Sequence, residues 1–281
     1  MVIPLVVSIA LMAGKILGPK IIALEGKTMN VAETDNVASN LNDFFEGLST
    51  HPVFNNDYFQ YIKENEWNPQ TYELYRANFF YRTELTVKGI AHVCARSAAV
   101  NDMDTLILFA YILSEETGFG NKAHCHEFFM ENALNIYGET EFSLAPTKVQ
   151  EAKYSEYIIP ETVAYRERIQ ELISDSYPRM LGVAMALETH ADIMLTNFRD
   201  AFRKNRKKLP EDVYQNKVEV YFNSHVESGV EERHAEDARM CVINNCKTRE
   251  DYNEIKHGAL GAIEVQQEMW DAMYQKCLVL A

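Results

Sequence analysis

Three stretches of the sequence carry glutamates and histidines at spacings that suit metal binding. They are LSEETGFGNKAHCHEFF (113–129), MALETHADIM (185–194) and FNSHVESGVEERHAEDA (222–238). Carboxylates and imidazoles without a required thiolate make up the ligand set of non-haem iron and manganese. The sequence therefore raises the hypothesis of a redox-metal site. Its candidate ligands are Glu116, His126, Glu188, His225, Glu231 and His234.

Each stretch also has a purely structural interpretation. Glu115 and Glu116 could cap or flank a helix end, and the polar segment 225–237 could be a solvated helix. Glu188 is harder to explain in this way, because its neighbours in LGVAMALETHADIML are apolar and a buried carboxylate needs a partner or a metal. Taken together, on three segments that should be buried helices, these residues favour a metal site.

The elements expected to position these residues are helices. From about residue 38 apolar residues recur at helical spacing, with no alternating strand pattern and no internal repeat. The segment 105–116 is apolar on nearly every side, which indicates a buried helix, and the preceding NDMD is a good N-terminal cap. We expect the following helix to end at Gly138 and a later one to begin at Pro160. The pattern predicts an all-α fold, with one domain over residues 29–281 built from about seven to nine helices.

Composition and charge exclude several classes of function. The chain has 281 residues, of which 47% are apolar, and a formal net charge of −14. Nucleic acid is excluded as a partner, because binding phosphates needs a basic surface. The five cysteines include no C-x-x-C pair, which argues against a disulfide framework and a cysteine zinc site. A reducing, cytoplasmic location fits this pattern.

Residues 1–28 differ from the rest of the chain. The apolar run from Val2 to Gly14 is shorter than the roughly 18 apolar residues that span a bilayer, and Lys15 and Lys20 interrupt any extension. The segment also lacks the basic start and the cleavage site of a signal peptide. We expect residues 1–28 to be an apolar appendage outside the domain, without stable membrane insertion.

The same three stretches resemble the signatures of a known family, the haem-oxygenase-like di-iron oxidases and oxygenases. These are all-α proteins that bind no haem and hold two irons inside a helical bundle. The resemblance runs from about residue 75 to the C-terminus. EETGFG followed by HEFF matches the first signature and implies Glu116 and His126 as ligands. The lone glutamate in ALE implies Glu188, and YFNSHVESGVEERH implies His225 and His234.

The third signature departs from the family pattern. The family usually separates its two histidines by seven residues and has an aspartate four after the first, whereas His225 and His234 lie nine apart and position 229 is glycine. Nine residues at about 100° each put two side chains on opposite faces of a helix, so both reach one cluster only if the helix breaks, and Gly229 is the natural place. Three residues could replace the aspartate: Glu227, Glu231 and Glu232. We favour Glu231, which stands three residues before His234, as the family's aspartate does.

The resemblance implies two Fe(II) ions, O2 as co-substrate and a small-molecule substrate. Activities in the family include N-oxygenation, oxidative C–C cleavage of amino acids and decarboxylation of fatty acids to alkenes. N-oxygenating members carry an extra carboxylate one helix upstream, for which Glu84 in YRTELTVKG is the candidate, but its position matches poorly. We therefore expect oxidation or cleavage of a small carboxylate-bearing, amino-acid-like substrate. The sequence singles out no arginine or lysine to bind that carboxylate.

Two other classes of function stay open. A thiamin-cleaving relative on the same bundle needs a cysteine nucleophile and no metal, and Cys125 is the one suitable thiol. A metal-free interaction protein would use the bundle as a scaffold only. A homodimer is compatible with each of these interpretations.

Overall fold

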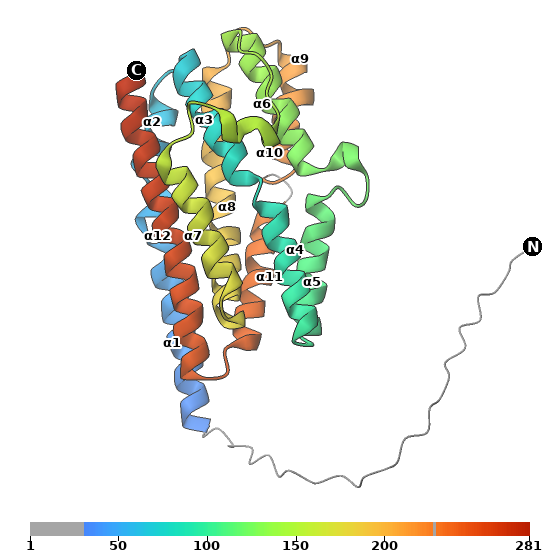
Figure 1. Ribbon diagram of the computed structural model, residues 1–281, viewed down its shortest axis with the longest axis vertical. Helices are drawn as coiled ribbons and strands as arrows, with labels where there is room; N and C mark the ends of the chain where they lie inside the picture. Colours follow the sequence, from blue (N-terminus) through green and yellow to red (C-terminus); the bar gives the residue numbers. More distant parts are fainter. Residues whose placement is uncertain (1–30, 227–228) are drawn as a thin grey trace, which may run out of the picture.

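Figure 1 shows the computed structural model, which describes residues 31–226 and 229–281. Within these ranges the regular structure is helical, as expected, and the predicted appendage, residues 1–28, lies outside them. No helix within the two ranges has both the length and the apolar content that crossing a lipid bilayer requires. The α-helices are α1 (Val31–Ser49), α2 (Asp57–Glu64), α3 (Pro69–Thr83), α4 (Thr86–Ala99), α5 (Met103–Glu116), α6 (His126–Phe142), α7 (Pro160–Ser174), α8 (Tyr177–Asn205), α9 (Glu211–Val213), α10 (Val220–Asn223), α11 (Val230–Asn245) and α12 (Arg249–Leu280). Short helical turns join them: η1 (Pro52–Asn55), η2 (Lys122–His124), η3 (Val149–Tyr154) and the π-helical η4 (Tyr214–Glu219).

The helices are more numerous than the expected seven to nine. The excess comes from short segments such as α9 and α10, which precede the third ligand-bearing stretch and are too brief to show a periodicity. The local signals were otherwise informative: Asp102 caps α5 through the backbone N–H three residues on, and Pro160 is the first residue of α7. The expected helix end at Gly138 is wrong, because α6 continues to residue 142. Gly138 is instead a packing position, where a Cβ would lie 2.8 Å from the ring of Tyr72.

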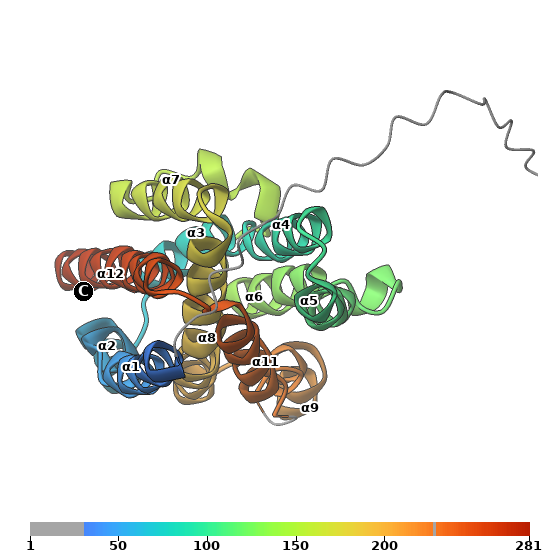
Figure 2. The same ribbon diagram turned by 90° about the horizontal axis from the view of Figure 1, so that it is seen from below.

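Helix α8 lies at the centre of the bundle. It is 29 residues long and packs against α2, α4, α7, α11 and α12, which Figure 2 shows arranged around it. The α4–α5 pair reaches the central helix through α4, and α5 packs against α11 on the same side. The three stretches singled out from the sequence are therefore carried on helices that meet at one side of α8.

Two glycines allow α8 and α12 to approach closely. A Cβ at Gly182 would collide with the carbonyl oxygen of Ile255, and a Cβ at Gly258 would collide with that of Arg179. Because the atoms in the way are backbone atoms, a larger residue at either position would push the two helices apart. The pair therefore fixes α8, with its central glutamate, against the longest helix of the fold.

An aromatic core holds α3 and α8 together. The ring of Trp67 stacks on Tyr75 at a centroid distance of 5.6 Å and meets Phe202 edge-on at 5.0 Å, while Tyr75 meets Phe198 at 4.9 Å. All four side chains are buried. Such pairs contribute about 0.5–1.5 kcal/mol each beyond the burial of their area. This end of the bundle is apolar and tightly packed, which leaves the polar cluster described below to the other half of α8.

Candidate metal centre

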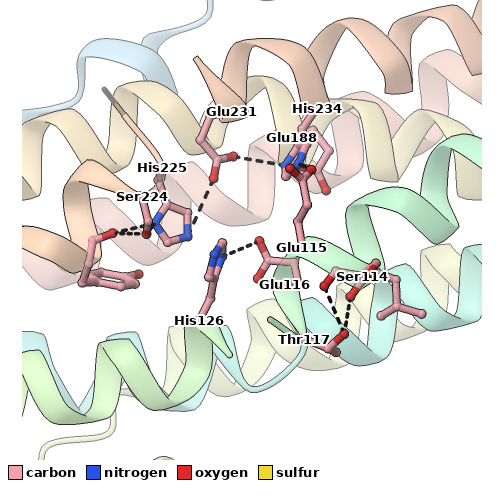
Figure 3. A network of polar contacts seen from close by, with 12 residues as sticks. Ser114, Glu115, Glu116, Thr117, His126, Glu188, Ser224, His225, Glu231 and His234 are labelled. Atoms are coloured by element: carbon pink, nitrogen blue, oxygen red, sulfur yellow. Dashed lines mark hydrogen bonds and ion pairs between the residues drawn. The ribbon is translucent and has the colours of Figure 1, made fainter. Parts of the chain in front are cut away.

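The predicted ligands come from five places in the chain and point toward one another inside the bundle (Figure 3). These places are the end of α5, the start of α6, the middle of α8, the turn after α10 and the first turns of α11. The side chains they contribute are Glu116, His126, Glu188, His225, Glu231 and His234. Four of the six are less than 9% exposed: Glu116, His225, Glu231 and His234.

Two groups of ligand atoms share one carboxylate. In the first group, formed by Glu116, His126 and His225, the ligand atoms all lie within 4.8 Å of one another. In the second group, formed by Glu116, Glu231 and His234, they meet the same limit. A carboxylate has two oxygens, so Glu116 could serve an ion on either side of it. We call the first group the histidine-rich corner.

A tight turn forms the histidine-rich corner. Helix α5 ends at Glu116, and Gly118 follows with a φ of 71°. A Cβ at Gly118 would lie 2.5 Å from backbone atoms of the same turn, so the position requires glycine. The turn places Nδ1 of His126 3.1 Å from Oε1 of Glu116. The ring of His126 lies at a centroid distance of 4.3 Å from that of His225, which approaches from the other side.

The acid-rich corner consists of Glu188, Glu231 and His234. Nδ1 of His234 lies 3.7 Å from Oε2 of Glu188 and 3.9 Å from Oε2 of Glu231. Burial, together with the charge of Glu116, raises the pKa of Glu188 to about 8. Burial and the neighbouring Glu188 raise the pKa of Glu231 well above its usual value. Carboxylates crowded in this way are stabilised by a cation placed between them.

The histidine-rich corner has the opposite electrostatics. Burial would raise the pKa of Glu116, but the hydrogen bond with His126 and the nearby imidazoles lower it below its usual value. Burial and the neighbouring His126 lower the pKa of His225 to about 4. His225 is therefore a neutral imidazole near pH 7, which is the form that binds metals.

The backbone orients His225. Its Nδ1 lies 2.7 Å from the carbonyl oxygen of Tyr221, and because a carbonyl can only accept, Nδ1 carries the proton. Nε2 is then left with a free lone pair, and it faces Oε1 of Glu231 at 3.9 Å. An outer partner of this kind fixes the tautomer and ring orientation of histidine ligands in metal sites.

Glu115 orients His234, as the Tyr221 carbonyl orients His225. The sequence did not reveal this role of Glu115. Oε2 of Glu115 accepts a hydrogen bond from Nε2 of His234 at 2.9 Å, which turns Nδ1 toward the acid-rich corner. Nη2 of Arg233 lies 2.6 and 2.5 Å from the two oxygens of Glu115. Burial opposes the charge of Glu115, but these two partners lower its pKa below the usual value. The available signal was the Glu115–Glu116 pair itself, since adjacent helix residues project about 100° apart and so serve different neighbours.

The helical segment that carries the third signature is broken between His225 and His234, as their nine-residue spacing requires. Helix α10 ends at Asn223 and α11 begins at Val230, and Gly229 precedes α11 in the left-handed conformation with a φ of 64°. This confirms the expected break at Gly229. The break allows His225 and His234 to face one cluster although they are nine residues apart.

Of the three candidates for the replaced aspartate, Glu231 faces the cluster. Its side chain is 3% exposed, whereas the adjacent Glu232 is exposed to solvent. Glu227 lies outside the described residues. The i, i+3 spacing to His234 puts both side chains on the inner side of α11.

Other residues weighed from the sequence lie elsewhere. His124 is exposed in η2, and His190 is buried against the rings of Phe54 and Phe59, away from its neighbour Glu188. Glu84 forms ion pairs with a lysine and an arginine. Neither Glu84 nor Cys125 lines the cavity beside the cluster.

That cavity lies between α3, α4, α5, α6, α7 and α8. All the predicted ligands except His234 line it, so it opens directly onto both corners. Its remaining walls are mainly apolar and include Ile90, Val93, Phe109, Met130, Ile169 and Ile173. A mostly apolar cavity with a few polar groups at one place is the usual form of a small-molecule site.

Comparisons with solved structures identify the fold. A CADD-like protein of unknown function from Nostoc punctiforme has 12% sequence identity and a TM-score of 0.63, over 88% of this chain and 96% of that one. A second crystal structure of that protein gives 14% identity and a TM-score of 0.65, over 87% and 98%. A domain of unknown function with a heme oxygenase-like fold from Shewanella denitrificans gives 15% identity and a TM-score of 0.56, over 90% and 95%. At these identities the likeness shows the fold alone, a haem-oxygenase-like bundle.

Sequence comparison identifies the family. No curated protein matches this chain. The model of a family described as "Iron-containing redox enzyme" matches residues 76–267, which is more than half of the chain and includes all six predicted ligands. These residues also include both corners of the cluster and the turn that joins α5 to α6. The chain therefore belongs to the iron-containing redox enzyme family.

Proposed function

We propose that the protein is a non-haem di-iron oxidoreductase that uses O2 to oxidise or cleave a small carboxylate-bearing substrate. The observation that carries this proposal is the shared position of Glu116, whose oxygens lie within 4.8 Å of ligand atoms from both groups. Membership of the iron-containing redox enzyme family supports iron as the metal and redox chemistry as the general reaction type. A bridging carboxylate flanked by histidines and further carboxylates suits a pair of ions better than a single one.

In this proposal His126 and His225 would hold one Fe(II), and Glu231 and His234 would hold the other. Glu116, which belongs to both groups of ligand atoms, would serve both ions, and Glu188 would complete the acid-rich corner. Three carboxylates then offset most of the charge of two Fe(II) ions, which removes the repulsion that raises the pKa values of Glu188 and Glu231. Bound ferrous ions supply the electrons for reducing O2.

The chain's own contribution is to fix the ligands and to shape the space beside them. The Tyr221 carbonyl and the Glu115 carboxylate each hold one histidine in a single orientation. The apolar walls of the cavity exclude water from the reacting substrate. Both features are built by residues of the bundle itself.

One alternative has specific support. The apolar walls suit a substrate with a substantial apolar body, which keeps oxidative decarboxylation of a fatty acid as a second candidate reaction. N-oxygenation has no such support, because Glu84 is held in ion pairs away from the cavity.

Anaerobic titration with Fe(II), followed by exposure to O2, tests the proposal. We expect about two irons per chain and rapid O2 consumption. Glu231→Ala should lower both, and Glu232→Ala, the neighbouring exposed glutamate, is the matched control that should lower neither. Absence of iron binding together with activity that is lost in Cys125→Ser would instead indicate a metal-independent hydrolase, and absence of both would indicate a scaffold.

A further inference from the structure

A buried arginine lines the same cavity and has no acidic partner among the described residues. Arg82 lies in the last turn of α3 and is 8% exposed. Within the described part of the chain its one hydrogen bond runs from Nη2 to Oε1 of Gln266, at 2.5 Å, and its Nε has no acceptor. The guanidinium carbon lies 5.3 Å from the ring centre of Tyr165 and 5.9 Å from that of Trp270. A buried charge held by one neutral amide and two rings is incompletely compensated.

A second arginine on the same helix shows what a compensated site looks like. Arg76, two turns earlier and 2% exposed, donates to Glu73 at 2.6 Å, to the carbonyl oxygen of Ala145 at 2.9 Å and to Asn135 at 3.0 Å. One of these acceptors is a carboxylate, so Arg76 is neutralised within the fold, although its Nε, like that of Arg82, has no acceptor among the described residues. Arg82 differs because its open side faces the cavity rather than the protein.

The groups around Arg82 need an acceptor, not another donor. Within the described ranges, Nε2 of Gln266 and Nε1 of Trp270 are both buried N–H donors without an acceptor. Gln266 is already bonded to Arg82, and Trp270 lies against it, although of the three residues only Arg82 lines the cavity itself. A water molecule could satisfy one of these donors but would leave the positive charge unbalanced. A carboxylate offers several acceptor sites and the missing charge, and it fits the planar fork of a guanidinium.

The rest of the cavity specifies what the carboxylate must be attached to. Helix α8 presents a continuous face to it from Ala184 to Leu195, about 16 Å along the helix axis. Glu188 is the single charged residue on that face, and the facing walls from α4 and α7 are mainly apolar, while α6 adds Glu127. The cavity therefore accommodates an apolar chain or ring system of several carbons.

We infer that Arg82 anchors the carboxylate of the substrate, and that the substrate is a carboxylic acid with an apolar body. The position of Arg82 in the cavity orients that body along α8 and past the iron ligands. The oxidation of such a substrate rests on the proposed function, but its binding by Arg82 does not need the metal. The two claims can therefore fail separately.

Calorimetric binding of matched eight-carbon probes tests the inference. Octanoate, octan-1-ol and octylammonium would be titrated into the full-length protein, without metal and with Fe(II) under anaerobic conditions. We expect octanoate to bind about tenfold or more tightly than octan-1-ol in both forms. Octylammonium, a cation that the glutamates of the metal-free cluster attract, should bind weakly in the Fe(II) form. Arg82→Met should weaken octanoate binding by about 30-fold or more and leave octan-1-ol unchanged. Arg82→Lys keeps the charge but loses the planar fork of donors, so its affinity for octanoate should lie between those of the wild type and Arg82→Met.

Two results would overturn the inference. One is equal binding of octanoate and octan-1-ol by the metal-free wild-type protein, a comparison that needs no variant to fold. The other is a preference for octanoate that appears only with Fe(II) and survives in a folded Arg82→Met protein, because the carboxylate would then bind the metal. If no iron binds but the preference exists and depends on Arg82, the proposed reaction fails while the anchor stands.

Discussion

The two corners of the cluster both adjoin Glu116 but differ in the side chains that they bury. The histidine-rich corner brings together two imidazoles with ring centroids 4.3 Å apart, and the pKa of His225 falls to about 4. The acid-rich corner brings together two carboxylates and one imidazole, and the pKa of Glu188 rises to about 8. In the first corner His225 is neutral near pH 7 and Glu116 is ionised, which are the forms that bind a metal. In the second corner the glutamates hold protons near pH 7, because their pKa values are raised. These protons must leave before the carboxylates can bind a metal.

Removing the shared carboxylate should have the largest effect. Glu116→Ala takes one ligand from each corner, and we expect it to abolish binding of both irons and all O2 consumption. Iron content per chain after anaerobic loading and desalting measures this. Circular dichroism should show an unchanged helical content, and a variant that retains both irons would show that Glu116 is not shared.

Removing a ligand that belongs to one corner should halve the iron content. His126→Ala should remove the iron of the histidine-rich corner, and Glu188→Ala should weaken or remove that of the acid-rich corner, with the bundle folded in both cases. Mössbauer spectra of the ⁵⁷Fe-loaded variants should each show one remaining site, with different parameters for the two proteins. His124→Ala is the control, because this exposed histidine should leave both irons in place. Identical remaining spectra for the two variants would show that the corners are not separate sites.

Loss of an outer partner should affect one corner only. Glu115→Gln weakens the hydrogen bond that turns Nδ1 of His234 toward the acid-rich corner. We expect about 10–100-fold weaker iron binding there, measured by competition with a chelator, and no change at the histidine-rich corner. An equal loss at both corners would mean that Glu115 supports the fold rather than the orientation of His234.

The corners should also differ in their response to pH. Below about pH 8 Glu188 holds a proton that iron must displace, and the raised pKa of Glu231 adds to this effect, so binding at the acid-rich corner should weaken about tenfold or more for each unit that the pH falls. Burial keeps His225 neutral down to about pH 4, so binding at the histidine-rich corner should depend on pH less steeply than binding at the acid-rich corner. Titrating His126→Ala, which keeps only the acid-rich corner, and Glu188→Ala, which keeps only the other, separates the two responses. Parallel pH profiles would contradict the assignment.

The fold class and the positions that form the cluster could be predicted from the sequence, because each depends on a pattern within one stretch of the chain. Glu188 stood out because a lone acid in an apolar helix needs a partner, and the nine-residue spacing from His225 to His234 demanded the break that occurs at Gly229. These arguments depend on helical periodicity, which the sequence shows directly.

The residues that the sequence missed depend on contacts between distant helices. The hydrogen bond from His234 to Glu115 joins α11 to α5, and the open face of Arg82 depends on how α3 packs against α12 and α7. Arg76 and Arg82 are indistinguishable in the sequence, and only their surroundings in the fold show which one is neutralised. The helix count failed for a related reason, since α9 and α10 are too short to leave a periodic pattern.

The most direct test of a shared di-iron centre is an anomalous-difference map at the iron edge, from crystals prepared with Fe(II) without oxygen. We expect two peaks about 3.5–4 Å apart, with Glu116 bound to both, His126 and His225 on one side and Glu231 and His234 on the other. A single peak, or two peaks of which only one contacts Glu116, would contradict the account.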